Sequence, residues 1–194
     1  MFKRLRYAFE YALVVVAIAV LQRLPLAWVR ALGRGLGRAA YHLGVARRDA
    51  RINLEERLGL REPAERDRVL KGAYAGFGQT MLELLTMPVI SDAALKEEFV
   101  FEGMDALQAI HASGRGIVCF SAHYGNWEWM GAALVQNQLP VTFLIGTQSN
   151  PWVDRRFNQH RASKGMKMTR IADIRGALKA LKGGGLVAIL PDQD

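Results

Sequence analysis

The chain of 194 residues has a single cysteine, few prolines and no long unbroken apolar stretch. The lone Cys119 excludes an intramolecular disulfide, and its apolar neighbours are typical of a small core residue. The sequence also lacks a Gly-x-Ser-x-Gly motif and a cluster of Cys and His residues at metal-ligand spacing. These absences argue against the usual serine hydrolase and against a metal centre, so we expect neither a metal ion nor another cofactor.

The longest apolar run covers residues 11–21 and follows a basic segment around Lys3, Arg4 and Arg6. As a helix this run rises about 16 Å, whereas the hydrocarbon core of a bilayer is about 30 Å thick. No small-residue cleavage site follows Leu21, which argues against a signal peptide. We therefore expect a retained helix that enters or lies in the membrane interface.

The net charge is +8, and the basic residues gather in two zones, residues 1–51 and 155–182, on either side of a more acidic middle. A basic protein can bind nucleic acid or an anionic membrane surface. We find no recognised nucleic-acid module, and the first basic zone alternates with apolar runs rather than stacking aromatics. The sequence therefore favours a membrane surface over nucleic acid.

A second helix is predicted to start at Pro25, with Arg30, Arg34 and Arg38 four residues apart on one face. This spacing is typical of a basic amphipathic helix at an anionic membrane surface. The alternative is a helix that packs in the core and has a solvated arginine edge. Three glycines of this segment are expected to allow close helix approach: Gly33, Gly35 and Gly37.

Short apolar segments alternate with segments of helical periodicity in the second half of the chain. The predicted strands cover residues 99–101, 117–120, 141–145, 166–171 and 186–190, and the predicted helices 103–112, 126–136, 151–164 and 173–182. This alternation predicts an α/β fold with a mixed or mainly parallel sheet flanked by helices. We expect a membrane-associated helical segment at residues 1–45 and an α/β domain at residues 46–194.

The candidate catalytic residues are His123 and Glu128, which follow the predicted strand 117–120. On one continuous helix they would point to different faces, but a turn before a helix that begins at Asn126 lets them meet. An imidazole beside a carboxylate can take the proton of a hydroxyl, while the carboxylate fixes the tautomer. We predict His123 as general base and Glu128 as its orienting partner; the alternative is a packed or capping histidine without chemistry.

The string His123-Tyr124-Gly125-Asn126-Trp127-Glu128 resembles the lipid A biosynthesis acyltransferases, within the wider lysophospholipid and glycerolipid acyltransferase superfamily. Further similar pieces are Asn53-Leu54, Glu83, Asn150-Pro151 with Asp154-Arg155, and residues 190–194. The resemblance implies transfer of a fatty acyl chain from acyl carrier protein or acyl-CoA to a hydroxyl of a lipid A precursor or related glycolipid or phospholipid. It also implies a place at the cytoplasmic face of the cell inner membrane.

The same resemblance implies a set of substrate-binding residues: Tyr124, Gly125, Asn126, Asn150, Arg155 and Arg170. Many relatives have Tyr-Arg-Pro where this chain has Ile145-Gly146-Thr147, so an expected arginine is absent. The acceptor can therefore be a lipid other than the usual lipid A precursor. Relatives also continue beyond the position of Asp194, so we expect the α/β domain to be incomplete at its carboxyl end.

Two other functions are compatible with these features of the sequence. One is a noncatalytic membrane-binding scaffold of the same fold, and the other is a lipid hydrolase that uses water in place of the acceptor hydroxyl. For the acyltransferase, the expected partners are a membrane lipid acceptor, acyl carrier protein and an anionic membrane surface.

Overall fold

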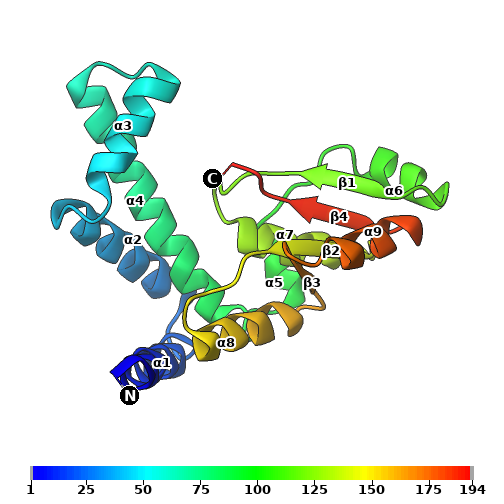
Figure 1. The fold of residues 1–194 in the computed structure, drawn as a ribbon, viewed down its shortest axis with the longest axis horizontal. Coiled ribbons are helices and arrows are strands. Elements are labelled where there is room, and N and C mark those ends of the chain that lie inside the picture. Colours follow the sequence, from blue (N-terminus) through cyan, green and yellow to red (C-terminus); the bar gives the residue numbers. More distant parts are fainter. Residues whose placement is uncertain (1, 193–194) are drawn as a thin grey trace. The chain divides into compact units, whose positions relative to one another are not determined.

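The computed structural model describes residues 2–192 and divides them into two compact units. Residues 23–83 form a helical unit, and the other described residues form a unit built on a β-sheet (Figure 1). No helix in residues 2–192 combines the length and the apolar character needed to span a bilayer. Gln193 and Asp194, the end of the last family-like segment, lie outside the described residues.

The helical unit contains α2 (Leu26–His42), α3 (Arg47–Leu58) and most of α4 (Pro63–Thr86). Helices α2 and α4 touch through glycines. A Cβ atom on Gly37 would lie 1.9 Å from the carbonyl oxygen of Tyr74, and one on Gly78 would lie 2.3 Å from that of Gly33. The predicted close helix approach is therefore confirmed for Gly33 and Gly37, whereas Gly35 faces open space.

Two arginines of the predicted stripe on α2 form hydrogen bonds with side chains of α4. Arg30 donates from Nε to Oε1 of Glu83 at 2.6 Å, and Glu83 is only 1% exposed. Arg34 donates from Nη1 to the side-chain oxygen of Gln79 at 2.9 Å. Arg30 is thus partly buried against α4, whereas Arg34 and Arg38 are exposed, and contact of this stripe with a membrane stays a prediction.

The sheet-based unit alternates strands and helices. In chain order it contains α1 (Phe2–Leu21), α5 (Asp92–Glu97), α6 (Met104–Ala112), β1 (Ile117–Phe120), α7 (Trp127–Val135), β2 (Val141–Ile145), α8 (Pro151–Ala162), β3 (Lys167–Arg170), α9 (Ile174–Lys182) and β4 (Leu186–Ile189). Four of these helices begin at side-chain caps: Ser91, Asn126, Asn150 and Asp173. The predicted order of strands and helices from residue 103 onward is confirmed.

The four strands pair in the order β1-β4-β2-β3, and each pair is parallel. Strand β1 lies beside β4, with Phe120 opposite Ile189. The predicted α/β fold with a mainly parallel sheet is thus confirmed. Since all strands point the same way, the loops that follow them gather along one edge of the sheet, where α/β proteins usually bind ligands.

The strand predicted at residues 99–101 is absent. This segment is irregular, and Val100 is 91% exposed, although two aromatic side chains in it, Phe99 and Phe101, stack with ring centroids 6.3 Å apart. The prediction was wrong because three apolar residues favour a strand only where a neighbouring strand supplies hydrogen bonds, and none of the described strands lies beside this segment.

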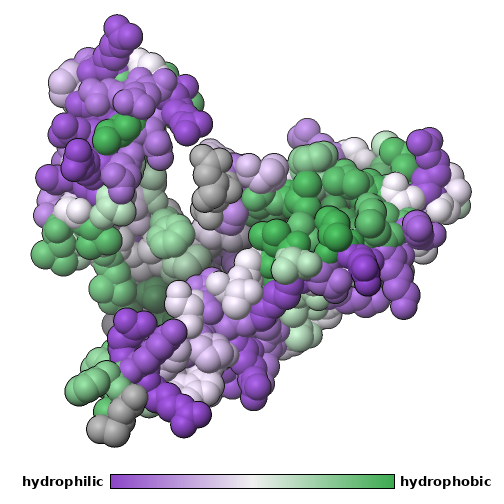
Figure 2. Space-filling model, in the orientation of Figure 1, coloured by the Kyte–Doolittle hydropathy of each residue, from purple (hydrophilic) through white to green (hydrophobic). Residues whose placement is uncertain are grey.

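The two faces of the sheet are covered unequally. Phe143 of β2 packs against α7 at Gly131, which places helix on that face. The strand register puts Val118 and Phe120 of β1 on the opposite face, where they are 45% and 72% exposed. Figure 2 shows apolar residues gathered over the region of β1 and β4.

Candidate functional site

His123 lies in the loop between β1 and α7, at the carboxyl edge of the sheet. The loop ends at Asn126, whose side-chain oxygen accepts a hydrogen bond from the backbone N–H of Trp129 at 2.9 Å and caps α7. Gly125 supports the turn with φ of +59°, a conformation that glycine adopts without a steric penalty. The predicted break between strand and helix is confirmed, and it leaves His123 outside both elements.

The imidazole of His123 is held by Asp192, which follows β4. Nδ1 of His123 lies 2.8 Å from Oδ1 of Asp192, and the backbone N–H of His123 donates to Oδ2 of the same carboxylate, also at 2.8 Å. The hydrogen bond from the imidazole is the main reason why the pKa of the Asp192 carboxyl lies below its ordinary value. A charged carboxylate on Nδ1 favours the tautomer with the proton on Nδ1, so Nε2 carries the lone pair.

The second ring nitrogen of His123, Nε2, is not held by the described part of the chain. Nε2 has no hydrogen-bond partner among residues 2–192, and the side chain of His123 keeps 25% of its surface exposed. The indole of Trp127 packs edge-on against the imidazole, with ring centroids 5.0 Å apart. Thus the ring is fixed on two sides while one nitrogen can accept a proton from solvent or from a bound hydroxyl.

Glu128 binds Arg161 and does not contact His123 in this structure. Its two carboxylate oxygens accept hydrogen bonds from Arg161, at 2.6 Å from Nη2 and 2.9 Å from Nε. The Glu128 side chain is 8% exposed and that of Arg161 13%. The expected His123–Glu128 pair is replaced by His123–Asp192, because Glu128, in the first turn of α7, points to α8 and reaches its guanidinium.

The residues expected to bind substrate occupy different surroundings. Tyr124, next to His123, is 89% exposed, whereas Asn150 is only 6% exposed. The Asn150 side-chain oxygen caps α8, and its Nδ2 donates to the carbonyl oxygen of Tyr7 at 3.0 Å and to Oε2 of Glu10 at 2.9 Å. Asn150 therefore joins α8 to α1.

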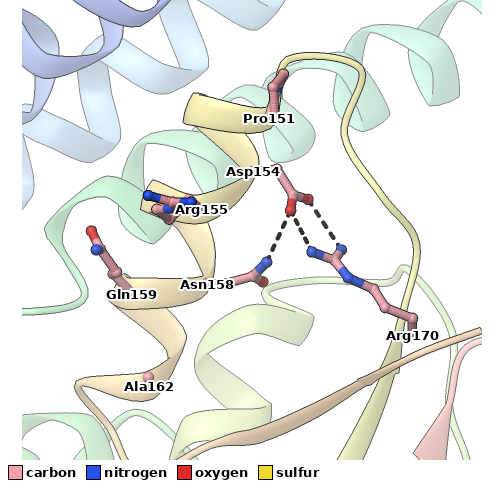
Figure 3. Close-up of a pocket in the computed structure, with 7 residues that line it drawn as sticks. All are labelled: Pro151, Asp154, Arg155, Asn158, Gln159, Ala162 and Arg170. Carbon is pink, nitrogen blue, oxygen red and sulfur yellow. Dashed lines mark hydrogen bonds and ion pairs between the residues drawn. The ribbon is translucent and has the colours of Figure 1, made fainter. Parts of the chain in front are cut away.

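Arg155 and Arg170 line a separate cavity of about 480 Å³ beside α8, shown in Figure 3. Arg170 forms a two-armed ion pair with Asp154 and also donates to the carbonyl oxygen of Gly146 at 2.7 Å. The hydrogen bonds from Arg170 hold the pKa of the Asp154 carboxyl below its ordinary value. Neither His123 nor the loop that carries it lines this cavity.

The sequence offers a signal for Asp192, although its role was not predicted. His123 comes three residues after Phe120, Asp192 comes three residues after Ile189, and these two strand residues are register partners. Equal offsets after paired parallel strands place the two side chains next to each other. This signal can be used only if β1 and β4 are known to pair. They are far apart in the sequence, so the sequence does not show that they pair.

Within residues 2–192, no three His, Cys, Asp or Glu side chains gather closely enough to hold an ion. The thiol of Cys119 in β1 has a raised pKa because it is partly buried. The group of this site that can take part in a reaction is the imidazole of His123. Asp192 holds its Nδ1 atom, and this arrangement suits general-base catalysis at Nε2.

Comparison with known proteins identifies similar chains. The chain is 28% identical over 174 residues to a lipid A biosynthesis acyltransferase of Haemophilus influenzae, covering 88% of this chain and 55% of that protein. It is 28% identical over 175 residues to the lipid A biosynthesis lauroyltransferase of Escherichia coli, covering 89% and 56%. It is also 30% identical over 120 residues to a phosphatidylinositol mannoside acyltransferase of Mycobacterium tuberculosis, covering 61% and 38%.

The chain thus spans between about a third and just over half of the length of the relatives it matches. The family model of bacterial lipid A biosynthesis acyltransferases matches residues 1–194. This match covers the whole chain, including the string from His123 to Glu128 on which the resemblance was based. The chain belongs to the bacterial lipid A biosynthesis acyltransferase family.

Proposed function

We propose that the protein is an O-acyltransferase that moves a fatty acyl chain from a thioester donor to a hydroxyl group of a membrane lipid, with His123 as general base. The observation that carries this proposal is the His123–Asp192 pair, in which Nδ1 lies 2.8 Å from the carboxylate and Nε2 forms no hydrogen bond within residues 2–192. Family membership supports acyl transfer, and the names of the relatives support a lipid acceptor.

The reaction needs one proton transfer at Nε2 of His123. The acceptor hydroxyl gives its proton to Nε2 while its oxygen attacks the thioester carbonyl, and Asp192 stabilises the imidazolium that forms. The tetrahedral intermediate then breaks its carbon–sulfur bond. The leaving sulfur takes the proton back from Nε2, so an ester and a free thiol are produced and His123 returns to its starting state.

Glu128 and Arg161 have a positioning role in this proposal. Their bidentate pair joins α7 to α8 immediately behind the loop of His123, and Nη1 of Arg161 also donates to Asn158 at 2.9 Å. A charge pair with this geometry holds two helices in a single arrangement. The pair therefore fixes where α7 starts, and with it the position of the imidazole.

The donor in this proposal is acyl carrier protein or acyl-CoA, and the acceptor is a lipid A precursor or a related glycolipid or phospholipid. The acceptor and the cytoplasmic face of the inner membrane follow from the family resemblance. Helix α1 supports membrane association, because six exposed apolar side chains recur at helical spacing along it: Phe2, Leu5, Phe9, Leu13, Val16 and Val20. Together with Lys3 and Arg6, this stripe suits the membrane interface.

The direct test is acyl transfer by the His123→Ala variant, with acyl carrier protein and acyl-CoA thioesters as donors and lipid A precursor or phosphatidylinositol mannoside as acceptors. We expect the rate to fall about 10²- to 10⁴-fold, because the general base is removed. Circular dichroism and vesicle binding should be unchanged, since the side chain is partly exposed and lies in a loop.

Three outcomes contradict the proposal. Undiminished transfer by His123→Ala removes the general base. Vesicle binding by the full-length wild-type protein without transfer to any lipid favours a noncatalytic scaffold. Release of free fatty acid without an acylated lipid favours a hydrolase in which water replaces the acceptor hydroxyl.

A further inference from the structure

The cavity beside α8 contains a positive charge that no carboxylate of the described chain neutralises. The cavity has a volume of about 480 Å³, and its polar lining comes from Asp154, Arg155, Asn158, Gln159 and Arg170. Asp154 accepts hydrogen bonds from Arg170, from Asn158 and from the backbone N–H of Gln148. Both oxygens of the Asp154 carboxylate therefore already accept hydrogen bonds from other groups of the protein.

Arg155, in contrast to Asp154, has no bonding partner within the described residues. Its side chain is exposed, lines the cavity and forms no ion pair or hydrogen bond with residues 2–192. Figure 3 shows Asp154, Asn158 and Arg170 joined to one another, whereas no bond is drawn to Arg155. With Asp154 and Arg170 neutralising each other, the cavity keeps the single positive charge of Arg155. A guanidinium group suits bidentate binding of a phosphate, and the amides of Asn158 and Gln159 can donate to the remaining oxygens.

The surroundings of Arg155 point to the headgroup region of a membrane. Arg155 also lines a second hollow, of about 320 Å³, together with Tyr11 of α1 and Trp152 of α8. The rings of Tyr11 and Trp152 pack edge-on, with centroids 6.1 Å apart. Tyr and Trp are typical of the boundary between hydrocarbon and water, where lipid phosphates also lie.

The position of the cavity in the sheet-based unit agrees with this chemistry. Helix α1 carries the exposed apolar stripe that we assign to the membrane interface, and Asn150 fastens the start of α8 to α1 at Tyr7 and Glu10. Arg155 lies in the second turn of α8. If the stripe of α1 enters the interface, Arg155 is carried to the neighbourhood of the headgroups.

We infer that the cavity at Arg155 binds the phosphate of an anionic lipid headgroup, with Asn158, Gln159 and Arg170 as polar neighbours. This inference rests on the proposed membrane-associated function and specifies a lipid-binding site separate from the His123–Asp192 pair. A concave site of this volume takes a single compact headgroup, whereas docking of an acidic protein needs a broad surface.

The test is vesicle binding by the full chain, with vesicles of phosphatidylcholine that do or do not contain phosphatidic acid. Arg155→Gln removes the guanidinium, and Arg175→Gln is the matched control, because Arg175 is an exposed cation of α9 outside the cavity. We expect Arg155→Gln to weaken binding to phosphatidic acid vesicles about tenfold or more, as for the loss of charge-assisted hydrogen bonds. Arg175→Gln should weaken it no more than about fivefold, as for one surface cation.

Arg155→Lys provides a second variant that keeps the charge and removes the two-armed geometry. We expect it to bind phosphatidic acid vesicles less well than wild type and better than Arg155→Gln. Circular dichroism and thermal unfolding of all three variants should match wild type, since both arginines are exposed.

Four outcomes overturn the inference. Equal losses for Arg155→Gln and Arg175→Gln show diffuse charge attraction only. Binding of glycerol 3-phosphate or inorganic phosphate as tight as that of the vesicles, and dependent on Arg155, shows a soluble phosphate as the ligand. Loss of acyl carrier protein binding with unchanged vesicle binding assigns Arg155 to a protein partner. If Arg155→Gln binds both vesicles and acyl carrier protein as well as wild type, Arg155 binds neither the lipid nor the carrier protein.

The inference and the proposed function fail in different ways. Vesicle binding is measured without a donor, so it does not depend on turnover. His123→Ala should bind phosphatidic acid vesicles like wild type, because His123 does not line the cavity. If the wild-type protein transfers acyl chains and Arg155→Gln binds vesicles normally, only the proposed site at Arg155 is overturned. If the wild-type protein binds vesicles through Arg155 but transfers no acyl chain, only the proposed enzymatic function is overturned.

Discussion

Asp192 lies beside His123 in space, whereas Glu128 is near it only along the chain, and the two carboxylates have different surroundings. Asp192 is partly exposed, with 37% of its side chain accessible, and both of its oxygens accept hydrogen bonds from His123. Glu128 is buried and gives both oxygens to Arg161. One carboxylate therefore acts on the imidazole and the other on the packing of α7 against α8.

This difference predicts opposite effects of two isosteric substitutions. Asp192→Asn should lower kcat about 10- to 100-fold, because a hydrogen bond to a charged group at Nδ1 is weakened when the imidazolium forms. Its unfolding free energy should change little, since Asp192 is partly exposed. Glu128→Gln should instead destabilise the fold by about 3–5 kcal/mol, because it leaves the guanidinium of Arg161 buried without its counter-charge.

Steady-state kinetics and urea unfolding of the two variants measure both effects. The double variant Glu128→Gln with Arg161→Met serves as the control, because it removes the buried charge together with its partner and should recover part of the stability. If Glu128→Gln lowers kcat at full stability while Asp192→Asn has normal kinetics, the orienting carboxylate is Glu128.

At the scale of elements, the packing of α2 on α4 depends on glycines. Gly37 and Gly78 leave no room for a Cβ atom, since backbone atoms of the other helix lie 1.9 Å and 2.3 Å from the position it would take. Close backbone approach lets Arg30 reach the buried Glu83 across the same interface. The helical unit therefore combines small residues with an ion pair at the same contact.

Gly37→Ala should destabilise this unit, because the added methyl group collides with the backbone carbonyl of Tyr74 and the helices must separate. We expect a loss of about 1–3 kcal/mol, as for other overpacked contacts. Gly35→Ala is the matched control. Nothing lies within 4 Å of its Cβ position, so the same substitution should stabilise α2 by about 0.5–1 kcal/mol.

Urea unfolding followed by circular dichroism measures these free energies. A Gly37→Ala variant as stable as Gly35→Ala would show that α2 and α4 are not held at the distance the structure gives.

At the scale of the whole molecule, the exposed apolar stripe of α1 is the feature through which we propose that the protein contacts a membrane. The opposite side of α1 carries the buried residues Ile18 and Leu21, and Tyr11 on this side contacts Trp152 of α8. The stripe and the packed side divide the helix between two environments, as expected for a helix that lies in an interface.

Replacing Phe9 and Leu13 together by Gln should move the protein from the membrane fraction toward the soluble fraction. These side chains are 66% and 55% exposed, so their loss costs little folding energy while it removes apolar area from the membrane contact. We expect vesicle partitioning to weaken at least about tenfold.

The matched control replaces Val89 and Val100 by Gln, because these residues are also exposed and apolar but lie outside α1. Its partitioning should equal that of wild type. Equal partitioning of the α1 variant and this control would contradict a membrane contact through the stripe.

Much of the fold follows from local patterns in the sequence. Strands β1, β2 and β4 are short apolar runs between turn residues, and helices α7, α8 and α9 begin at Asn126, Asn150 and Asp173, which are good helix caps. These signals act over a few residues, so the sequence is sufficient to reveal them. The segment at residues 99–101 shows the limit, since an apolar triplet without a pairing partner stays irregular.

The sequence by itself determined the α/β class, the family and the loop that carries His123, because each is encoded in neighbouring residues. Only the tertiary structure decided which carboxylate holds the imidazole. Asp192 is 69 residues from His123 and reaches it through the parallel pairing of β1 with β4, whereas Glu128, five residues away, is taken by Arg161. Pairing between distant strands depends on how the whole sheet is assembled, so the spacing of residues along the chain could not reveal it.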